Sequence, residues 1–413
     1  MSDYVVGLDI GTSKVRAIIG EISDDGVFHV TGVGSSPSTG LRKGVVVNIE
    51  NTVASISQAI ETAEMMSGVE VTHCLIGVGG THIEGINSRG VVAVSGRGRD
   101  NREIGKEDIN RVIDAAKAIV IPMDRKMLHV VPQSYIVDDQ KGIKDPRNMI
   151  GVRLEAEVHI ITGSATSIKI LENSVNRANL LIDAHMFNGL AAVKAVMTEE
   201  ESELGSIMID LGGGTTTVLV MAGGAPLYTA VLPVGGIQVT NDISIVKGIS
   251  AETAEKIKVD EGCCWMPLIE ENEEVLLPGV GGRPPLVIPR SEICEIIQPR
   301  MAEILTMVHE KIKGIIHSRP FSGNVVITGG GANLPGVVEL ASEIFDTQAI
   351  RIGFPGNYGG LTGDYRSPDY ATVIGLFLTA YEQYSKQRTE QIHREYPAKT
   401  VSGRIKSWFK EFF

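Results

Sequence analysis

A strand-turn-strand pattern occurs twice in this sequence, and it limits the folds that the chain can adopt. In each copy an apolar run ends in an aspartate, small and hydroxyl-bearing residues follow, and a second apolar run returns; the copies span residues 4–20 and 207–221. Superposing Asp9 on Asp210 also superposes the glycines that lie two positions later. Each copy predicts a β-hairpin with a tight glycine turn. A unit repeated in this way predicts two similar domains that face each other across a cleft.

The turns of both copies have the residue types of a phosphate-binding loop. Glycine lets backbone N–H groups approach an anion without interference from a Cβ atom, and hydroxyl side chains add donors. A carboxylate at the strand end can bind the water molecules that Mg²⁺ retains. One turn of this kind would more often serve chain geometry alone. A third glycine turn, residues 329–331, follows an apolar run and precedes a helical pattern, so the sequence predicts a nucleotide site.

Composition narrows the functional class. The 413 residues predict several domains, and a hydrophobic fraction of 43% suffices for buried cores. A net charge of −12 disfavours nonspecific binding of nucleic acid. The four cysteines have no metal-ligand spacing and are expected to be reduced thiols. We expect no membrane-spanning segment and no signal peptide, because the sequence has no apolar run of roughly 18 residues and begins directly with a predicted strand.

The pattern of predicted elements in residues 83–160 differs from that of the segments on either side. This block contains a charged, glycine-rich loop at residues 96–102, a predicted helix at 107–119 and two predicted strands. We interpret it as an inserted subdomain. The alternative is that these are ordinary loops and elements of the first domain.

Helical periodicity and breaker residues locate other elements. An amphipathic helix is predicted at 51–67 with Asn51 as its N-cap. A long helix is predicted at 291–317, where Pro299 is expected to kink or restart it. Residues 262–290 are rich in glycine and proline and are predicted to be irregular.

Three segments together resemble the nucleotide-binding motifs of the superfamily that contains actin, sugar kinases and heat-shock chaperone ATPases. They are Gly7-Leu8-Asp9-Ile10-Gly11-Thr12-Ser13-Lys14, Ile209-Asp210-Leu211-Gly212-Gly213-Gly214-Thr215-Thr216 and Val326-Ile327-Thr328-Gly329-Gly330-Gly331. Further segments resemble one family within it, the bacterial cell-division family FtsA. They are Glu203-Leu204-Gly205, Ala254-Glu255-Lys256-Ile257-Lys258 and Gly281-Gly282-Arg283-Pro284-Pro285. The resemblance covers essentially the whole chain.

The resemblance implies an α/β, actin-like (ribonuclease-H-like) fold of two lobes, with duplicated core subdomains, an inserted subdomain and a C-terminal amphipathic helix. The implied boundaries are 1–82 with 161–192 for the first core subdomain (1A), 83–160 for the insertion (1C), 193–240 with 300–384 for the second core subdomain (2A), 241–299 for a small subdomain (2B), 385–400 for a flexible linker and 401–413 for a membrane-targeting amphipathic helix.

The resemblance also implies which residues bind ATP and Mg²⁺. One wall of the phosphate site would consist of Asp9, Gly11, Thr12, Ser13 and Lys14, and the opposite wall of Gly212, Gly213, Gly214 and Thr215. Asp9 and Asp210 would hold Mg²⁺ through water, and Gly329, Gly330 and Gly331 would approach the α-phosphate and adenosine. Glu255 and Lys258 match positions that contact ribose and adenine. They lie three residues apart on one predicted helix, a spacing that fits a surface salt bridge equally well.

One position departs from the superfamily pattern. Related hydrolases usually have glutamate or glutamine at the start of the helix after the strand that precedes the central hairpin, where it positions the attacking water. The matching residue here is Asn188. Its side chain is shorter and a poor base, so we predict ATP binding with slow or undetectable hydrolysis.

The segment 402–413 has the pattern of an interfacial membrane helix. Apolar side chains recur at helical spacing on one face and lysines flank them: Ile405, Trp408, Phe409 and Phe412, with Lys406 and Lys410. Such a face favours binding at a lipid surface, although the segment is too short to span it. The alternative is a helix docked on the protein's own core. Weak lipid binding by one helix would need several linked copies for stable attachment, which favours an oligomer or filament.

Together with this tail, the resemblance implies a membrane adaptor of the bacterial division ring, at the septum on the cytoplasmic face of the inner membrane. By resemblance, its partner is the C-terminal peptide of the tubulin-like protein FtsZ on the small subdomain, where Arg283 and Arg300 could pair with carboxylates, although surface arginines often have no such role. It would assemble with itself and contact later division proteins through residues 83–160. The alternatives are a small-molecule kinase of the same superfamily and a pilus-assembly ATPase. The sequence contains no Walker motif.

Overall fold

The two repeated segments form the hairpins that the sequence predicts, each within a five-stranded sheet. The computed structural model describes residues 3–22, 28–95, 103–279, 284–316 and 324–395. Strand β1 (Asp3–Ile10) pairs antiparallel with β2 (Lys14–Ile22), and β12 (Ser206–Leu211) pairs in the same way with β13 (Thr216–Ala222). Asp9 and Asp210 therefore lie near the ends of equivalent strands.

The two sheets have the same strand order. The first runs β11 (Leu181–Phe187), β6 (His73–Val78), β1, β2 and β3 (Phe28–Pro37), and the second runs β18 (Ile350–Ile352), β17 (Asn324–Thr328), β12, β13 and β14 (Ala225–Leu232). In both sheets the first strand of the hairpin is antiparallel to the second and parallel to the strand on its other side. The predicted α/β fold with a duplicated core is confirmed.

Helices complete a hydrophobic core beside each sheet. The first half contains α1 (Ile49–Ser67), α3 (Ala165–Arg177), α4 (Asn188–Val196) and α11 (Ala371–Glu395), and the second contains α6 (Gly236–Lys247), α7 (Ala251–Asp260), α8 (Ser291–Ile316) and α9 (Val337–Phe345). Asn48 caps α1 by accepting a hydrogen bond from the Asn51 N–H at 3.1 Å. The prediction of Asn51 as the cap is wrong, because an earlier asparagine already satisfies the first turn.

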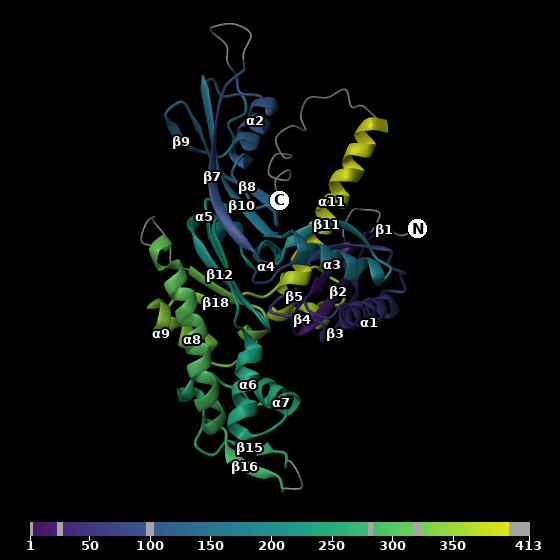
Figure 1. The fold of residues 1–413 in the computed structure, drawn as a ribbon, viewed down its shortest axis with the longest axis vertical. Helices are drawn as coiled ribbons and strands as arrows, with labels where there is room; N and C mark the ends of the chain where they lie inside the picture. The colour runs from purple at the N-terminus through teal and green to yellow at the C-terminus, as the bar shows by residue number, and fades with distance from the viewer. Residues whose placement is uncertain (1–2, 23–27, 96–102, 280–283, 317–323, 396–413) are drawn as a thin grey trace.

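Residues 83–160 form a unit with its own hydrophobic core. Strands β7 (Glu84–Ala93), β8 (Arg125–Val137), β9 (Gln140–Ile143) and β10 (Arg153–Ser164) form a sheet in the order β7-β10-β8-β9, and α2 (Lys106–Lys117) packs on it. Val112, Tyr135 and Leu154 are buried in this core, separate from the cores of the two halves. The block is an inserted subdomain, as predicted, and it stands at one end of the molecule (Figure 1).

The other end of the molecule is a small subdomain that contains a hairpin the sequence did not predict. Strand β15 (Glu274–Leu277) pairs with β16 (Leu286–Pro289) inside the segment predicted to be irregular, because short strands beside prolines and glycines give almost no periodic signal. Helix α8 runs through Pro299 without ending. Glu295 and Pro299 are both exposed, so water can satisfy the carbonyl group that a proline leaves unpaired.

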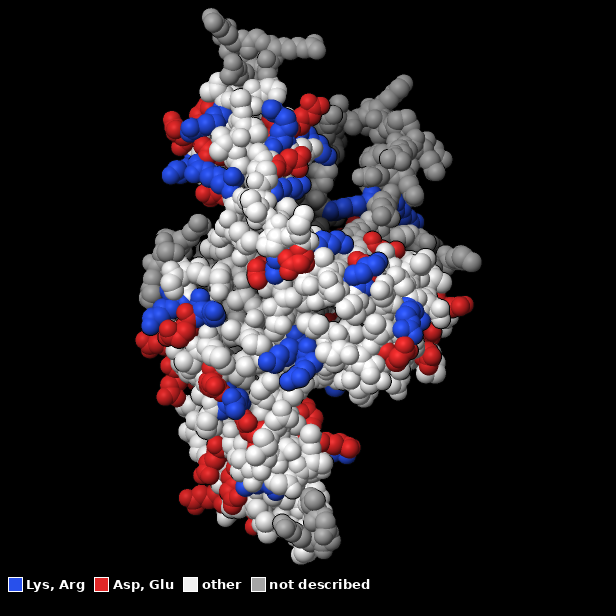
Figure 2. Space-filling model, in the orientation of Figure 1, with Lys and Arg blue, Asp and Glu red and all other residues white. Residues whose placement is uncertain are grey.

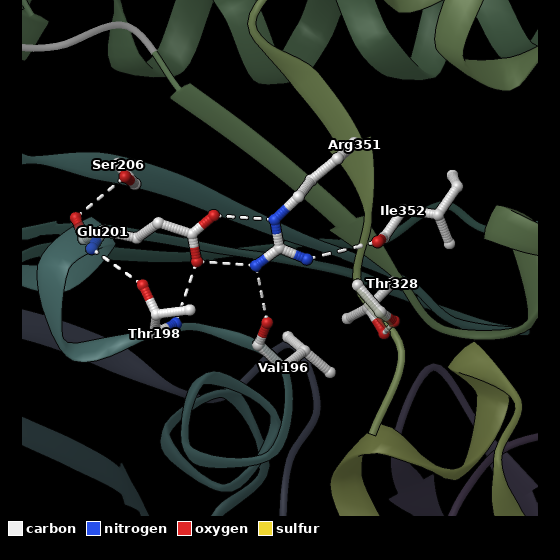
Figure 3. A network of polar contacts seen from close by, with 8 residues as sticks. Val196, Thr198, Glu201, Ser206, Thr328, Arg351 and Ile352 are labelled. Atoms are coloured by element: carbon white, nitrogen blue, oxygen red, sulfur yellow. Dashed lines mark hydrogen bonds and ion pairs between the residues drawn. The ribbon is translucent and has the colours of Figure 1, made fainter. Parts of the chain in front are cut away.

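Arg351 on β18 forms hydrogen bonds with residues 196–201, where the chain passes from the first half to the second. Arg351 donates to both carboxylate oxygens of Glu201 at 2.7 and 2.6 Å and to the Val196 carbonyl oxygen at 2.7 Å (Figure 3). Glu201 lies on α5 (Glu199–Leu204), where it also accepts from the Thr198 N–H at 2.9 Å. Burial alone would raise the pKa of Glu201, but these hydrogen bonds hold it below its usual value.

Helix α11 extends further than predicted. Residues 385–395, which we assigned to a flexible linker, continue the helix to Glu395, and Figure 1 shows this end projecting from the body. The lysines, glutamines, arginines and glutamates that suggested a linker are also good formers of an exposed helix. The segment 401–413 lies outside the described residues. Within the described part of the chain, none of the helices combines the length and apolar character needed to cross a bilayer.

Candidate functional site

A cavity of about 400 Å³ lies between the two halves, and residues from both hairpins line it. Every residue that the sequence assigned to nucleotide or Mg²⁺ lies on its wall: Asp9, Gly11, Thr12, Ser13, Lys14, Asp210, Gly212, Gly213, Gly214, Thr215, Glu255, Lys258, Gly329, Gly330 and Gly331. The structure thus brings these residues together from four separate stretches of chain. Their individual roles stay predictions.

The two glycine turns have the same internal geometry. The Gly11 N–H donates to the Lys14 carbonyl oxygen at 3.1 Å, and the Gly212 N–H donates to the Thr215 carbonyl oxygen at 3.0 Å. The turns also touch each other, because a Cβ atom on Gly214 would lie 2.7–2.9 Å from three side-chain atoms of Thr12. Two glycine turns that face each other form a cradle that suits the phosphates of a nucleotide, because backbone N–H groups in such turns can bind an anion.

Two carboxylates lie at the base of the cradle. Burial raises the pKa of Asp9 to about 6, against the lowering effect of Arg16 and of the Asn188 side chain. Burial also raises the pKa of Asp210 to about 7, and the neighbouring charge of Asp9 adds to this shift. Two acidic groups that burial makes costly to ionise are suited to a divalent cation, whose charge would stabilise both carboxylates.

Nucleotide affinity in the presence of Mg²⁺ is expected to fall as the pH is lowered through about 7 and then about 6. Protonation below these pKa values removes the negative charges of Asp210 and Asp9 that would attract the cation. We expect a decrease on the order of tenfold between about pH 7.5 and about pH 5.5, measured by calorimetric titration. The same titration with EDTA in place of Mg²⁺ is the control, and an equally steep profile there would contradict the assignment.

Asn188 contacts the first of these carboxylates. Its Nδ2 atom donates to Asp9 Oδ1 at 3.2 Å, and its Oδ1 atom packs against Gly77, where a Cβ atom would lie 2.4 Å away. The amide is therefore engaged with Asp9 at the start of α4. It presents no carboxylate that could accept a proton from an attacking water.

Glu255 and Lys258 form an ion pair that lies in the cleft. Lys258 Nζ is 2.7 Å from Glu255 Oε2 and also donates to Thr240 Oγ1 at 2.9 Å and the Gly236 carbonyl oxygen at 3.2 Å. The salt bridge that the spacing predicts is present, and both residues line the cavity. Their contact with a ribose or an adenine stays a prediction.

The third glycine turn packs on the second hairpin. A Cβ atom on Gly329 would lie 2.2 Å from Asp210 Oδ1, and one on Gly331 would lie 2.7 Å from Leu211 Cβ. Gly329 has a φ of 82°, a conformation that favours glycine. The third turn therefore needs glycine in order to lie this close to Asp210 on the wall of the cleft.

Several residues of the cavity wall lie outside the motifs of the sequence. Arg16 lies directly opposite Asp9 in the hairpin register, forms an ion pair with Asp369, and stacks over the Tyr370 ring with its guanidinium carbon 4.7 Å from the centroid. The hairpin register could have indicated Arg16. Asp369 is distant in sequence from every motif, so no sequence signal indicated it. Gly79 and Gly80 also line the cavity, immediately before the insertion.

A second hollow, of about 460 Å³, lies between α6 and α8 on the small subdomain. Its lining is Asp242, Ile245, Val246, Glu295, Ile296, Pro299, Arg300 and Glu303. Arg300 lies there, but its charge is already paired with Asp242, at 2.6 Å, and with Glu303. Figure 2 shows acidic side chains gathered over this end of the molecule. Arg283 lies outside the described residues.

Two comparisons with known proteins bear on the family. A family model described as "Cell division protein FtsA" matches residues 207–375, and one described as "SHS2 domain inserted in FTSA" matches residues 80–162. The relative named cell division protein FtsA from Pseudomonas aeruginosa is 40% identical over 99% of this chain and 98% of its own length. The chain belongs to the FtsA family. The FtsA relative from Borreliella burgdorferi is 41% identical over 100% of this chain and 99% of its own length.

Solved structures of actin-like proteins share the fold of this FtsA-family chain at low sequence identity. A PilM–PilN type IV pilus biogenesis complex matches with a TM-score of 0.65 at 15% identity, covering 91% of this chain and 98% of that chain. MreB5 of Spiroplasma citri bound to ADP matches with a TM-score of 0.52 at 14% identity, covering 94% and 98%. The predicted actin-like fold is confirmed, and the protein is a cell-division protein by family.

Proposed function

We propose that this FtsA-family protein binds ATP with Mg²⁺ between its two halves, assembles into filaments on the cytoplasmic face of the membrane and holds FtsZ there. The observation that carries the proposal is the cleft, where two equivalent glycine turns face each other above Asp9 and Asp210. The solved relatives lend support: one is titled as an MreB protein bound to ADP, and another as the MamK double helical filament.

We expect bound ATP to control assembly by its presence in the cleft, and rapid ATP hydrolysis to play little part. Asn188 occupies the place where a general base would be expected, and its amide is held by Asp9. A site that binds ATP and Mg²⁺ but lacks a base near the γ-phosphate hydrolyses slowly. The phosphates would then hold the two halves together for long periods, which suits a filament subunit.

The two alternative functions have weaker support. A pilus-assembly role rests on fold likeness at 15% identity, whereas the FtsA relatives match at 40–41% over nearly the whole chain. A small-molecule kinase would need a substrate pocket with a catalytic base beside the phosphates. Neither of the two cavities described above supports this. In the cleft, Asn188 takes the place of the base, and the hollow between α6 and α8 is a separate cavity with no phosphate loop in its lining.

Removing residues 402–413 is expected to abolish co-sedimentation with lipid vesicles and to leave nucleotide affinity unchanged. The physical reason is the apolar face of Ile405, Trp408, Phe409 and Phe412, which would enter the headgroup boundary. In the full chain, Trp408→Glu should lose most of the binding. Ser407→Gln, on the opposite face of the predicted helix, is the matched control and should keep it. Unchanged vesicle binding after the deletion would refute the membrane role of this segment.

The hollow between α6 and α8 is the proposed site for the FtsZ peptide. Ile245 and Val246 are 78% and 63% exposed and give it an apolar wall, while Asp242 and Glu303 already neutralise Arg300. We therefore propose that apolar contacts supply most of the affinity, and that a peptide carboxylate competes for Arg300.

Ile245→Asp is expected to weaken binding of an FtsZ C-terminal peptide at least tenfold, because it places a charge in the apolar wall. Fluorescence anisotropy with a labelled peptide measures this. Met65→Asp on α1 is the control, since Met65 is 79% exposed and α1 belongs to the first half, whereas the hollow lies between α6 and α8 of the second half. Equal peptide affinity of the two variants would exclude this hollow as the binding site.

A further inference from the structure

The inserted subdomain contacts the second half of the chain through polar side chains. His159 on β10 lies between two partners, with its Nδ1 atom 2.6 Å from Asn87 Oδ1 and its Nε2 atom 2.9 Å from Thr229 Oγ1. Asn87 Nδ2 donates to the Leu227 carbonyl oxygen at 2.9 Å. Gln133 Nε2 donates to the Pro226 carbonyl oxygen at 2.7 Å. Thr229 and Leu227 belong to β14, so we refer to these contacts as the β14 seam.

The hydrogen bonds of the β14 seam fit together in one arrangement. His159 is 1% exposed, and burial lowers its pKa to about 4, so the ring is neutral near pH 7. Asn87 Oδ1 can only accept, so His159 Nδ1 carries the proton and Nε2 accepts from the Thr229 hydroxyl. A hydrogen-bond network around a buried histidine, in which both ring nitrogens are paired, favours one relative position of the two units over others.

Strand β14 leads from this seam to the second phosphate loop. Just beyond its end, the Val234 carbonyl oxygen accepts from Thr216 Oγ1 at 3.0 Å. The Gly236 N–H then donates to the Gly212 carbonyl oxygen at 2.9 Å, and the Ile237 N–H donates to the Gly213 carbonyl oxygen at 2.8 Å. A displacement of β14 at the seam would therefore reach the turn that faces the phosphates.

A second connection runs from the insertion to the first phosphate loop. Gly79 and Gly80 lie between β6 and β7, where the chain enters the insertion, and both line the nucleotide cleft. A Cβ atom on Gly80 would lie 2.7 Å from the Gly44 carbonyl oxygen. The Gly44 N–H in turn donates to Thr12 Oγ1 at 2.9 Å. The insertion is thus tied by short contacts to both loops of the cradle.

We propose that the inserted subdomain is coupled to occupancy of the nucleotide cleft, with His159 as a remote positioning residue. A nucleotide that holds the two phosphate loops together stabilises the β14 seam, and an intact β14 seam stabilises the loops in the arrangement that binds nucleotide. The inference rests on the proposed nucleotide binding and adds its regulation. Because such coupling is reciprocal, a partner that binds the insertion and strains the seam weakens nucleotide binding, and a bound nucleotide tightens the seam.

The first test is nucleotide affinity in seam variants of the full chain. Thr229→Val keeps the side-chain shape and removes the hydroxyl donor, and we expect Mg²⁺–ATP affinity to fall on the order of fivefold, although Thr229 does not line the cleft. The double variant His159→Leu with Thr229→Val removes both polar partners together and guards against a folding defect from one unpaired group. Ser134→Ala is the control, because it removes a 3.1 Å hydrogen bond to Glu157 within the insertion.

The second test is hydrogen exchange. Saturating Mg²⁺–ATP is expected to slow amide exchange in β7 and β10 of the wild-type chain at least tenfold, and Thr229→Val should abolish this response. The coupling would be overturned, with nucleotide binding still standing, if both seam variants bound Mg²⁺–ATP with wild-type affinity and amide exchange did not respond to the nucleotide. A wild-type chain that binds no nucleotide in calorimetry would overturn the proposed function and the coupling with it.

Discussion

Replacing Asp210 with asparagine is expected to stabilise the nucleotide-free protein and to weaken Mg²⁺–nucleotide binding at least tenfold. The folded-state pKa of about 7 lies above the ordinary value of 3.8, so the folded state holds the proton more tightly than the unfolded state. Stability therefore falls as the pH rises between these two values, and above about pH 7 the folded protein carries a negative charge on the half-buried Asp210 side chain. Asparagine removes that cost, on the order of 2 kcal/mol, and also removes an oxygen charge that would hold the hydrated cation.

Two calorimetric measurements on one sample test this prediction. At about pH 8, the thermal midpoint without nucleotide should rise by a few degrees, while titration with Mg²⁺–ATP should show the weaker affinity. Asp139→Asn is the matched control, since the Asp139 side chain is fully exposed and should change neither quantity. A variant with lower stability and unchanged affinity would show that Asp210 is a structural residue and not part of a cation site.

Gly214→Ala is expected to weaken nucleotide binding on the order of tenfold to a hundredfold. The new Cβ atom would lie within 2.9 Å of three side-chain atoms of Thr12, and rotating Thr12 does not clear all of them. Thr12 is also held by the hydrogen bond from Gly44. The two phosphate loops must therefore separate by some tenths of an ångström, and small errors of placement in such a cradle are costly.

Gly314→Ala in α8 is the control for this substitution. A Cβ atom at Gly314 meets no atom within 4 Å, and alanine is the better residue in a helix interior by about 0.5–1 kcal/mol. This variant should be slightly more stable than wild type and should bind ATP equally well by titration calorimetry. If Gly214→Ala behaves in the same way as Gly314→Ala, the two loops do not form a common phosphate site.

The sequence predicted the repeated hairpins because their pattern is local and occurs twice. An apolar strand, an aspartate and a glycine turn specify a hairpin regardless of the surrounding chain, and the third glycine turn directly follows β17, the strand next to β12. These three segments contain about half of the residues that line the cleft. The approach of Glu255 and Lys258 to the cleft was inferred from the family resemblance and could not be inferred from their spacing.

Features that depend on tertiary contacts were missed. Asp369 pairs with Arg16 across most of the length of the chain, and no local pattern indicates this pairing. The β15–β16 hairpin was missed because nearby prolines outweighed the weak periodicity of its short strands. The cap of α1 was assigned to the wrong residue because two asparagines lie close together at the start of that helix. The β14 seam consists of ordinary polar residues whose partners only the folded chain brings together.

The extension of α11 carries the described chain away from the body of the first half. Tyr384 still packs against the core of the first half, and the helix then continues to Glu395. At about 1.5 Å per residue, residues 385–395 form a rod of roughly 16 Å. A rod transmits direction, whereas a flexible chain of equal length would not. A subunit attached at the tip of such a rod would keep a defined stand-off from a surface and a restricted tilt, so neighbouring subunits would present the same face to whatever lies beneath them.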